Sequence, residues 1–387
     1  MNLLEEARAL REEVVGLRHE VHRHPELGWH ETQTQALILR ELGRLGIPCQ
    51  AVCGTGVIAD LRGPSDGPII GLRADMDALP IEEQTEAPYA SVHPGMMHAC
   101  GHDCHVAMLL TAARILKAHE DEICGTVRLI FQPAEEIIEG AKAMCALPQL
   151  AELDLIFGAH VWIDLPVGTF SIEEGPRMAS ADNLYLTVRG KSAHGANPHR
   201  GVDAIVAACG VVGALQTVVS RAADPLEPLV VTIGTIEGGT SPNILADEVR
   251  MSGTVRSFNA AVRDESEARL ERTACAAAQS FGAECSFTYS RCTPATVNAP
   301  EPTLRARRAA VRLFGEDSLV HLEKTTGGED FAWYLSRVPG CYLFIGAGSE
   351  GKCCPHHHGH FDIEEEALVN GTALLAQLGL TAGKDAL

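Results

Sequence analysis

Short apolar segments that alternate with helical segments are the feature that most constrains how this chain folds. Residues 56–61, 69–72, 127–131 and 155–160 have the length and composition of buried strands, and residues 103–119 have a helical pattern between two of them. Strands that alternate with helices are typical of an α/β fold with a parallel or mixed sheet flanked by helices. We therefore expect such a sheet in the first half of the chain.

The middle of the chain has a different order of elements. It reads strand, helix, strand, strand, helix, strand, at residues 183–188, 203–220, 229–236, 248–258, 260–281 and 284–289. This is the split βαβ order of a ferredoxin-like α+β unit. An α/β character then resumes over residues 302–314, 341–346 and 363–378. Because 387 residues are too many for one core, we predict a larger domain of residues 1–180 and 292–387 with a small domain, residues 181–291, inserted into it.

Composition excludes several functional classes. The net charge of −20 and an aromatic content of 5% argue against binding to nucleic acid, which needs a basic face. The N-terminus is too charged for a signal peptide. Residues 204–220 carry no charge, but they are few for a membrane span and Asp203 stands as an N-cap, so we expect a buried helix of a soluble protein. The odd number of cysteines, 13, predicts reduced thiols and a cytoplasmic location.

Four places combine residue types that bind metals with positions at strand ends or in loops. Cys100-Gly101-His102 is the strongest, because a thiolate and an imidazole two residues apart can reach one site from a tight turn, and both suit Zn²⁺ and similar metals. Glu135-Glu136 follows an apolar run, and such a pair can divide into a metal ligand and a proton acceptor. His160 and the histidine-rich residues 355–361 are the other two places.

Each of these places also has an ordinary structural interpretation. A single histidine at a strand end is more often a hydrogen-bonded structural residue than a ligand. An adjacent pair of glutamates is more often solvated, and a histidine-rich loop can be merely polar. Taken singly, only the turn at Cys100 and His102 favours metal binding; taken together, the four places indicate one site that an open sheet could assemble.

The same motifs, in this order, resemble the aminoacylase/carboxypeptidase family of co-catalytic metallopeptidases. The resemblance is greatest to its amidohydrolase branch of N-acyl-amino-acid amidohydrolases, hippurate hydrolases and auxin-conjugate hydrolases. It extends over nearly the whole chain, through residues 72–80, 97–105, 132–136, 158–162, 190–199, 238–243, 253–256, 327–331 and the C-terminal histidine-rich loop.

The resemblance implies the chemistry of the larger, catalytic domain. Family members hold two divalent ions, Zn²⁺ or Mn²⁺ and in some cases Co²⁺ or Ni²⁺. Glu135 matches the general base, which takes a proton from the attacking water and returns it to the leaving amine. The positions that match the metal ligands are Cys100, His102, Glu136, His160 and His357.

The resemblance also implies a role for the inserted domain as a lid and dimerisation domain, and therefore a homodimer or a higher homo-oligomer. His194 matches a histidine that stabilises the oxyanion in the partner subunit's site. Asn243 and Arg256 match positions that hold the substrate, and Arg256 could pair with its α-carboxylate. A charge on the strand surface is an equally good interpretation of Arg256. The substrate is then a small N-acyl amino acid, whose amide bond is hydrolysed.

Several alternatives remain open in the sequence. Gly359 replaces the proline that relatives have before the final Phe361, so His356 or His358 could substitute for His357 as the last ligand. Asp75 stands where the wider family has a histidine ligand, and Asp77 could orient a ligand from outside the coordination sphere.

The same chemistry also fits an N-acetyl-diaminopimelate deacetylase or a dipeptidase, because pocket residues outside the motifs decide specificity. A non-catalytic homologue is a third interpretation, against which the intact Glu135 argues.

Overall fold

The structure is a computed structural model that describes residues 2–384. The chain forms two compact units. Unit 1 comprises Met1–Arg177, Val297–Glu323 and Asp330–Leu387, and unit 2 comprises Met178–Thr296 and Lys324–Glu329. The buried apolar side chains of the described residues form two separate clusters, one in each unit, so each unit has a hydrophobic core of its own.

Unit 1 is built on a seven-stranded mixed sheet in the order β1-β2-β4-β3-β5-β13-β6. The four strands β4, β3, β5 and β13 are parallel to one another. The strands at the two edges are antiparallel to their neighbours. The strands are β1 (Cys49–Val52), β2 (Gly56–Arg62), β3 (Ser65–Asp75), β4 (Cys124–Gln132), β5 (Leu155–Pro166), β6 (Phe170–Ser171) and β13 (Gly340–Gly348).

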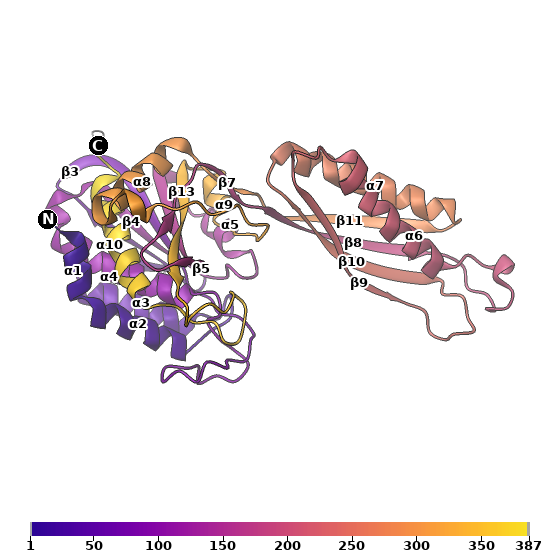
Figure 1. The fold of residues 1–387 in the computed structure, drawn as a ribbon, viewed down its shortest axis with the longest axis horizontal. Coiled ribbons are helices and arrows are strands. Elements are labelled where there is room, and N and C mark those ends of the chain that lie inside the picture. Colours follow the sequence, from indigo (N-terminus) through magenta and orange to yellow (C-terminus); the bar gives the residue numbers. More distant parts are fainter. Residues whose placement is uncertain (1, 385–387) are drawn as a thin grey trace. The chain divides into compact units, whose positions relative to one another are not determined.

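Two helices of unit 1, both labelled in Figure 1, have side chains that are buried on almost every face. α4 (His102–Ala118) and α10 (Glu366–Thr381) pack against each other and against the sheet, and the N-terminal helices cover them. The N-terminal segment forms two helices that meet at Leu10. The remaining helices of this unit are α1 (Leu3–Ala9), α2 (Arg11–Arg23), α3 (Thr32–Arg44), α5 (Gly140–Met144), α8 (Pro300–Phe314) and α9 (Ala332–Leu335).

The parallel strands bring the motif-bearing segments to one edge of the sheet. Asp75 at the end of β3 lies opposite Gln132 at the end of β4. Arg73 of β3 lies opposite Gly158 of β5. His160, two residues further along β5, therefore lies at the level of Asp75. Sites in open α/β sheets form beyond the carboxyl ends of parallel strands. The topology therefore gathers the turns that follow β3 and β4 beside the middle of β5.

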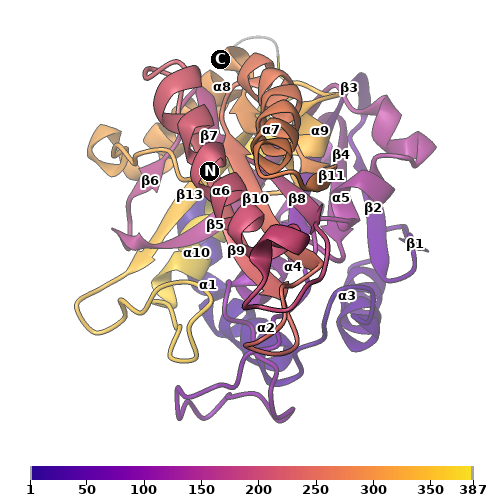
Figure 2. The same ribbon diagram turned by 90° about the vertical axis from the view of Figure 1, so that its right-hand side faces the viewer.

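Unit 2 is a four-stranded antiparallel sheet with two helices on one face (Figures 1 and 2). Its strand order, β11-β8-β10-β9, is that of a ferredoxin-like unit. The predicted fold class, a mixed α/β sheet with an inserted ferredoxin-like α+β unit, is confirmed. The elements are β8 (Ser180–Arg189), α6 (Ala204–Thr217), β9 (Leu229–Gly238), β10 (Glu248–Ser257), α7 (Ala260–Ser280) and β11 (Glu284–Thr293), and β7 (Gly175–Met178) and β12 (Thr296–Asn298) lie where the chain passes between the units.

The uncharged helix of unit 2 is less buried than the sequence predicted. Within the described residues, Ala204–Ala222 is the one helical stretch whose length and apolar composition would allow it to cross a membrane. Of its most apolar 18 residues, 33% are buried. Ala207, Val211 and Leu215 pack into the core of unit 2, but Ile205 and Val206 are exposed. The expectation of a buried helix was thus wrong for the outer face, because α6 covers the sheet without being covered itself.

Because the two cores share no side chain, we expect a core substitution to act on one unit alone. Leu270→Ala in α7 removes a fully buried side chain of unit 2 and should lower that unit's free energy of unfolding by about 2–5 kcal/mol. Leu109→Ala in α4 should do the same in unit 1. Differential scanning calorimetry of the metal-free protein would then show two transitions, each moved by one variant. A single transition that both variants lower would show that the units unfold together.

Candidate metal centre

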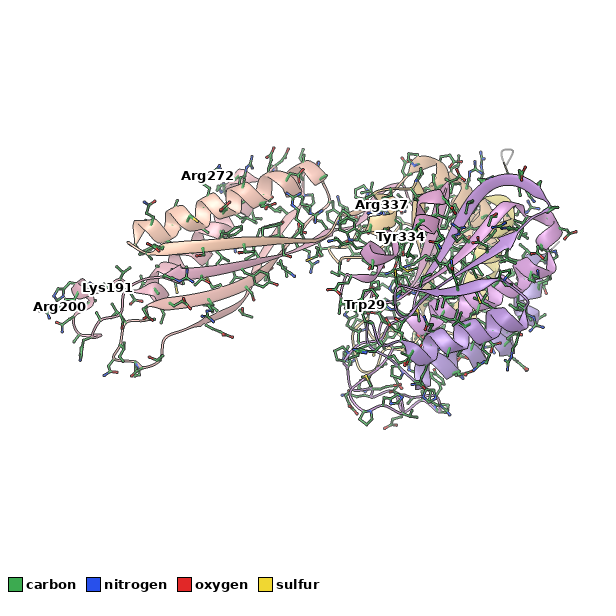
Figure 3. The ribbon with its side chains drawn as sticks, turned by 180° about the vertical axis from the view of Figure 1, so that it is seen from behind. Trp29, Lys191, Arg200, Arg272, Tyr334 and Arg337 are labelled. Carbon is green, nitrogen blue, oxygen red and sulfur yellow. The ribbon has the colours of Figure 1, made fainter. Side chains whose placement is uncertain are left out.

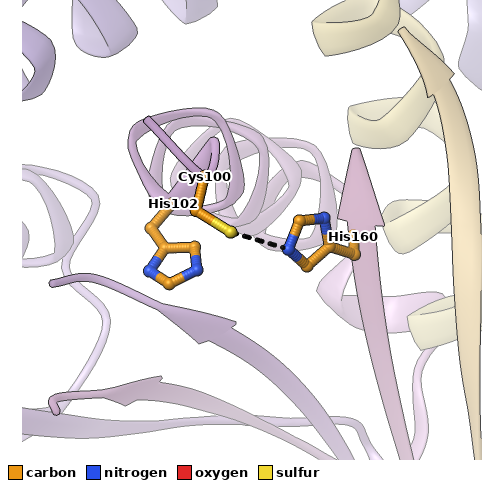
Figure 4. Close-up of side chains that lie close together, drawn as sticks. All are labelled: Cys100, His102 and His160. Carbon is orange, nitrogen blue, oxygen red and sulfur yellow. Dashed lines mark hydrogen bonds between the residues drawn. The ribbon is translucent and has the colours of Figure 1, made fainter. Parts of the chain in front are cut away.

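The turn before α4 presents Cys100 and His102 side by side. Gly101 between them has φ +92°, and a Cβ at this position would lie 2.4 Å from Cγ2 of Val161. Only glycine meets both demands. The turn brings the two side chains toward His160 of β5, whose Nε2 lies 3.4 Å from Sγ of Cys100 (Figure 4).

The turn after β4 presents Glu135 and Glu136. Ala134 adopts φ +56°, an uncommon conformation for a residue other than glycine. The turn is fixed by Asp77, whose two carboxylate oxygens accept hydrogen bonds from the backbone N–H groups of Glu135 (3.0 Å) and Glu136 (2.9 Å). The backbone oxygen of Asp77 also lies 2.9 Å from Nδ1 of His102. Asp77 therefore contacts both turns that carry candidate metal ligands.

The histidine-rich loop places one of its histidines with these residues. Nε2 of His357 lies 3.5 Å from Oε2 of Glu136, and its backbone N–H donates to the carbonyl of Ala99. His356 instead lies with Nε2 3.0 Å from the carbonyl oxygen of Val161. Nδ1 of His358 accepts from the backbone N–H of His360 at the exposed surface. The geometry thus favours His357 over its two neighbours as the last ligand.

The gathered residues fit a site for metal ions. Their donor atoms form overlapping groups within 4.8 Å: Cys100 with His102 and His160, Cys100 with Glu136 and His357, and His102 with Glu135 and Glu136. Nε2 of His102 and Oε1 of Glu136 are buried, lie 3.9 Å apart, and have no hydrogen-bond partner among the described residues. Thiolate, imidazole and carboxylate donors bind Zn²⁺ at about 2.0–2.3 Å, which places the donors of one ion at such separations.

Burial opposes the charged forms that metal binding requires. Burial raises the pKa of the Cys100 thiol well above its ordinary value, and the neighbouring Glu136 and Glu135 raise it further. Burial also raises the pKa of Glu136 to about 7, although His102 opposes this. For His160, burial lowers the pKa well below the ordinary value. A bound cation would reverse these penalties for the thiol and the carboxyl group.

A second layer of charged groups lies beneath the centre, and of its members the sequence pointed only to Asp75. The buried Asp75 carboxylate lies 2.5 Å from Nδ1 of His105 and from Nη1 of Arg73. Nε2 of His105 accepts from the backbone N–H of Val161, beside His160. Arg73 also donates to Asp330. The alternation of Arg73 and Asp75 on one strand indicates a shared face, but nothing local points to His105 or Asp330.

The residues predicted to hold substrate lie in unit 2, at two ends of its sheet. The loops that carry His194 and Asn243 are paired, since the backbone N–H of Gly195 donates to the carbonyl of Asn243 at 2.8 Å. Figure 3 shows Lys191 and Arg200, on either side of His194 in the sequence, at this end. Arg256 lies near the other end of β10, about 26 Å along the strand from Glu248 at about 3.3 Å per residue. Unit 2 does not bring His194 and Arg256 together.

The glycine of the first turn offers a test of the centre. Gly101→Ala should weaken Zn²⁺ binding at least tenfold, because the added methyl group would clash with Val161 and displace the turn that carries Cys100 and His102. Gly168→Ala is the matched control, since Gly168 has a similar φ of +87° with no atom within 4 Å of an added Cβ. Competition with a chromophoric chelator measures both affinities. Equal affinities would show that the turn does not hold a ligand pair.

Comparisons with known proteins agree with this geometry. Residues 71–381 match Peptidase family M20/M25/M40. An N-acetylcysteine deacetylase of Bacillus subtilis is 40% identical over 96% of this chain and 97% of its own length. IAA-amino acid hydrolase ILR1-like 4 of Arabidopsis thaliana is 37% identical over 94% and 84%, respectively. The crystal structure of Bacillus subtilis YXEP protein, a dinuclear metal-binding peptidase from the M20 family, superimposes with a TM-score of 0.86 at 37% identity, covering 97% of this chain and 99% of that one. The chain therefore belongs to peptidase family M20/M25/M40 and is a metal-dependent hydrolase that acts on amide bonds.

Proposed function

We propose that the protein hydrolyses the amide bond of N-acyl-L-amino acids and releases a carboxylate and the free amino acid. The observation that carries this proposal is Glu135, a buried carboxylate whose Oε2 lies 3.9 Å from Nε2 of His102, among the metal-binding groups. A purely structural or metal-storing site has no use for a carboxylate that is not needed as a ligand. The relatives named N-acetylcysteine deacetylase and IAA-amino acid hydrolase support the substrate class.

In the proposed mechanism, Cys100, His102, Glu136, His160 and His357 hold two divalent ions, Zn²⁺ or Mn²⁺ with Co²⁺ or Ni²⁺ as alternatives. The bound ions supply Lewis-acid chemistry that acidifies water and polarises the scissile carbonyl. Glu135 accepts the proton of the attacking water and delivers it to the nitrogen of the leaving amine. Asp77 fixes the positions of Glu135 and Glu136, because its carboxylate accepts hydrogen bonds from the backbone N–H groups of both.

Arg256 is our proposed anchor for the substrate's α-carboxylate. Its side chain is half-buried, and burial lowers the pKa of its guanidinium. Asp182 also acts on Arg256 electrostatically, but its two oxygens are hydrogen-bonded to the nearby Arg263, so the planar guanidinium of Arg256 is suited to bidentate binding of a carboxylate ligand.

We further propose that the protein is a homodimer in which unit 2 serves as the lid and as the dimer interface. β9 is an edge strand of its sheet and its Ile236 is 52% exposed, while Ile205 and Val206 of α6 are 42% and 51% exposed. Unpaired strand edges and apolar patches favour association. Nδ1 of His194 accepts from the backbone N–H of Ala196, which leaves Nε2 to donate to an oxyanion in the partner subunit's site.

We also propose a cytoplasmic location for the protein. All 13 cysteines are free, which is usual for proteins of that compartment.

A substrate panel tests the proposed reaction. We expect N-acetyl and N-benzoyl amino acids to be hydrolysed, activity to disappear on chelation, and Zn²⁺, Mn²⁺ or Co²⁺ to restore it. N-acetyl-diaminopimelate and dipeptides are the alternative substrates, and comparison of kcat/KM assigns the reaction. Full activity without metal would exclude the mechanism. A protein that holds two ions but hydrolyses none of these compounds would exclude the proposed substrate class.

Subunit complementation tests the roles of Glu135 and His194 together. Glu135→Ala and His194→Ala should each be nearly inactive while retaining two metal ions. When the two variants are mixed under conditions that exchange subunits, each heterodimer gains one site with both residues, so activity should return to about a quarter of the wild-type value. Absence of recovery despite subunit exchange would show that His194 acts within its own chain or not at all.

A further inference from the structure

A buried arginine on α2 lies outside the catalytic machinery and contacts two segments that are far apart in the sequence. The side chain of Arg18 is 1% exposed. It lies in unit 1 and contacts none of the metal-binding side chains. Burial of a guanidinium is costly unless carboxylates compensate its charge. The carboxylates that do so identify what Arg18 holds together.

The first segment is the start of α4. Nε of Arg18 donates to Oδ2 of Asp103 at 3.1 Å. The same oxygen lies 2.8 Å from Nδ1 of His22, one turn further along α2. Asp103 directly follows His102, so these contacts fix the helix end that carries Cys100 and His102 against α2.

The second segment is the loop that carries His357. Nη2 of Arg18 donates to Oδ1 of Asp362 at 2.7 Å. Asp362 also accepts from the hydroxyl of Tyr89 at 3.0 Å and from Nζ of Lys352 at 2.7 Å. The loop between Lys352 and Asp362 contains no helix or strand. The position of this loop therefore depends on side-chain contacts such as these. The segments that carry the other proposed ligands depend on them less.

We propose that Arg18 is a positioning residue that sets the affinity of the metal ion bound through His357, by joining Asp103 and Asp362 and so fixing the distance between two ligand-bearing segments. The other proposed ligands belong to a strand, a helix start or the turn that Asp77 clamps. His357 has a half-exposed side chain on a loop, at φ +63°. The inference rests on the proposed ligand role of His357.

Asp362→Asn tests the inference, because it removes the charge from one end of the connection. We expect the weaker-bound of two Zn²⁺ ions to lose affinity about 10–100-fold, measured on the metal-free protein by chelator competition, while the tighter ion is little affected. Activity at limiting Zn²⁺ should fall and should return at saturating Zn²⁺. A merely structural role would lower thermal stability without this rescue. Tyr89→Phe, which removes one hydrogen bond to Asp362, should shift the same affinity by a smaller factor and serves if Asp362→Asn does not fold.

Asp60→Asn is the matched control. Asp60 is paired with the buried Arg128 in the same unit, and its side chain is 21% exposed against 19% for Asp362. It should reduce thermal stability and leave both Zn²⁺ affinities unchanged. Equal effects of Asp362→Asn and Asp60→Asn on Zn²⁺ affinity would overturn the inference. A wild-type protein that binds fewer than two ions would instead contradict the proposed ligand set.

Discussion

The concentration of buried acidic groups at one edge of the sheet is the constraint on which the rest of unit 1 depends. Glu135, Glu136 and the Cys100 thiol share a space with Asp75 and Asp77, all buried or nearly so. Negative charges repel one another in a low-dielectric interior, and burial raises the pKa of Glu136 and of the Cys100 thiol. Arg73 and His105 contact the Asp75 carboxylate, and bound cations would compensate the charges of the groups above it. The surrounding backbone therefore has to hold the donors in place when their mutual repulsion would separate them.

Three local devices provide this rigidity. Gly101 allows a turn that a side chain would block. Asp77 accepts hydrogen bonds from the successive backbone N–H groups of Glu135 and Glu136. His105 connects the buried Asp75 to the backbone of β5 beside His160. Each device fixes a donor through the backbone or through a neighbour, and Nε2 of His102 and Oε1 of Glu136 have no hydrogen-bond partner among the described residues. Preorganised sites are built in this way because reorganisation during the reaction is costly.

The parts of this structure that the sequence could predict are those with local patterns. The order of elements in unit 2, the strand that ends at Gln132 and the turn at Cys100 and His102 follow from periodicity and residue type over a few positions. The contacts of Arg18 with Asp103 and Asp362 could not be predicted, since they join residues 85 and 344 positions apart. The exposed face of α6 escaped prediction for a related reason: an uncharged helix looks the same whether one face or both are covered. The resemblance to the family selects His357, with His356 and His358 as alternatives, and only the conformation of the loop shows which of the three lies beside Glu136.

The insertion of unit 2 into unit 1 has a consequence for synthesis of the chain. β13 pairs in parallel with β5 from the far side of the insertion, and α10 covers α4. During translation, the first half of unit 1 therefore cannot complete its fold until the inserted unit and the C-terminal segment have been made. Until then its sheet lacks β13 and its helix α4 is not covered by α10. At about 5–20 residues per second, the loop with His357 emerges many seconds after Cys100 and His102. Nascent chains consequently present a half-built cluster of thiol and imidazole groups, and assembly of the complete centre is an event that follows synthesis.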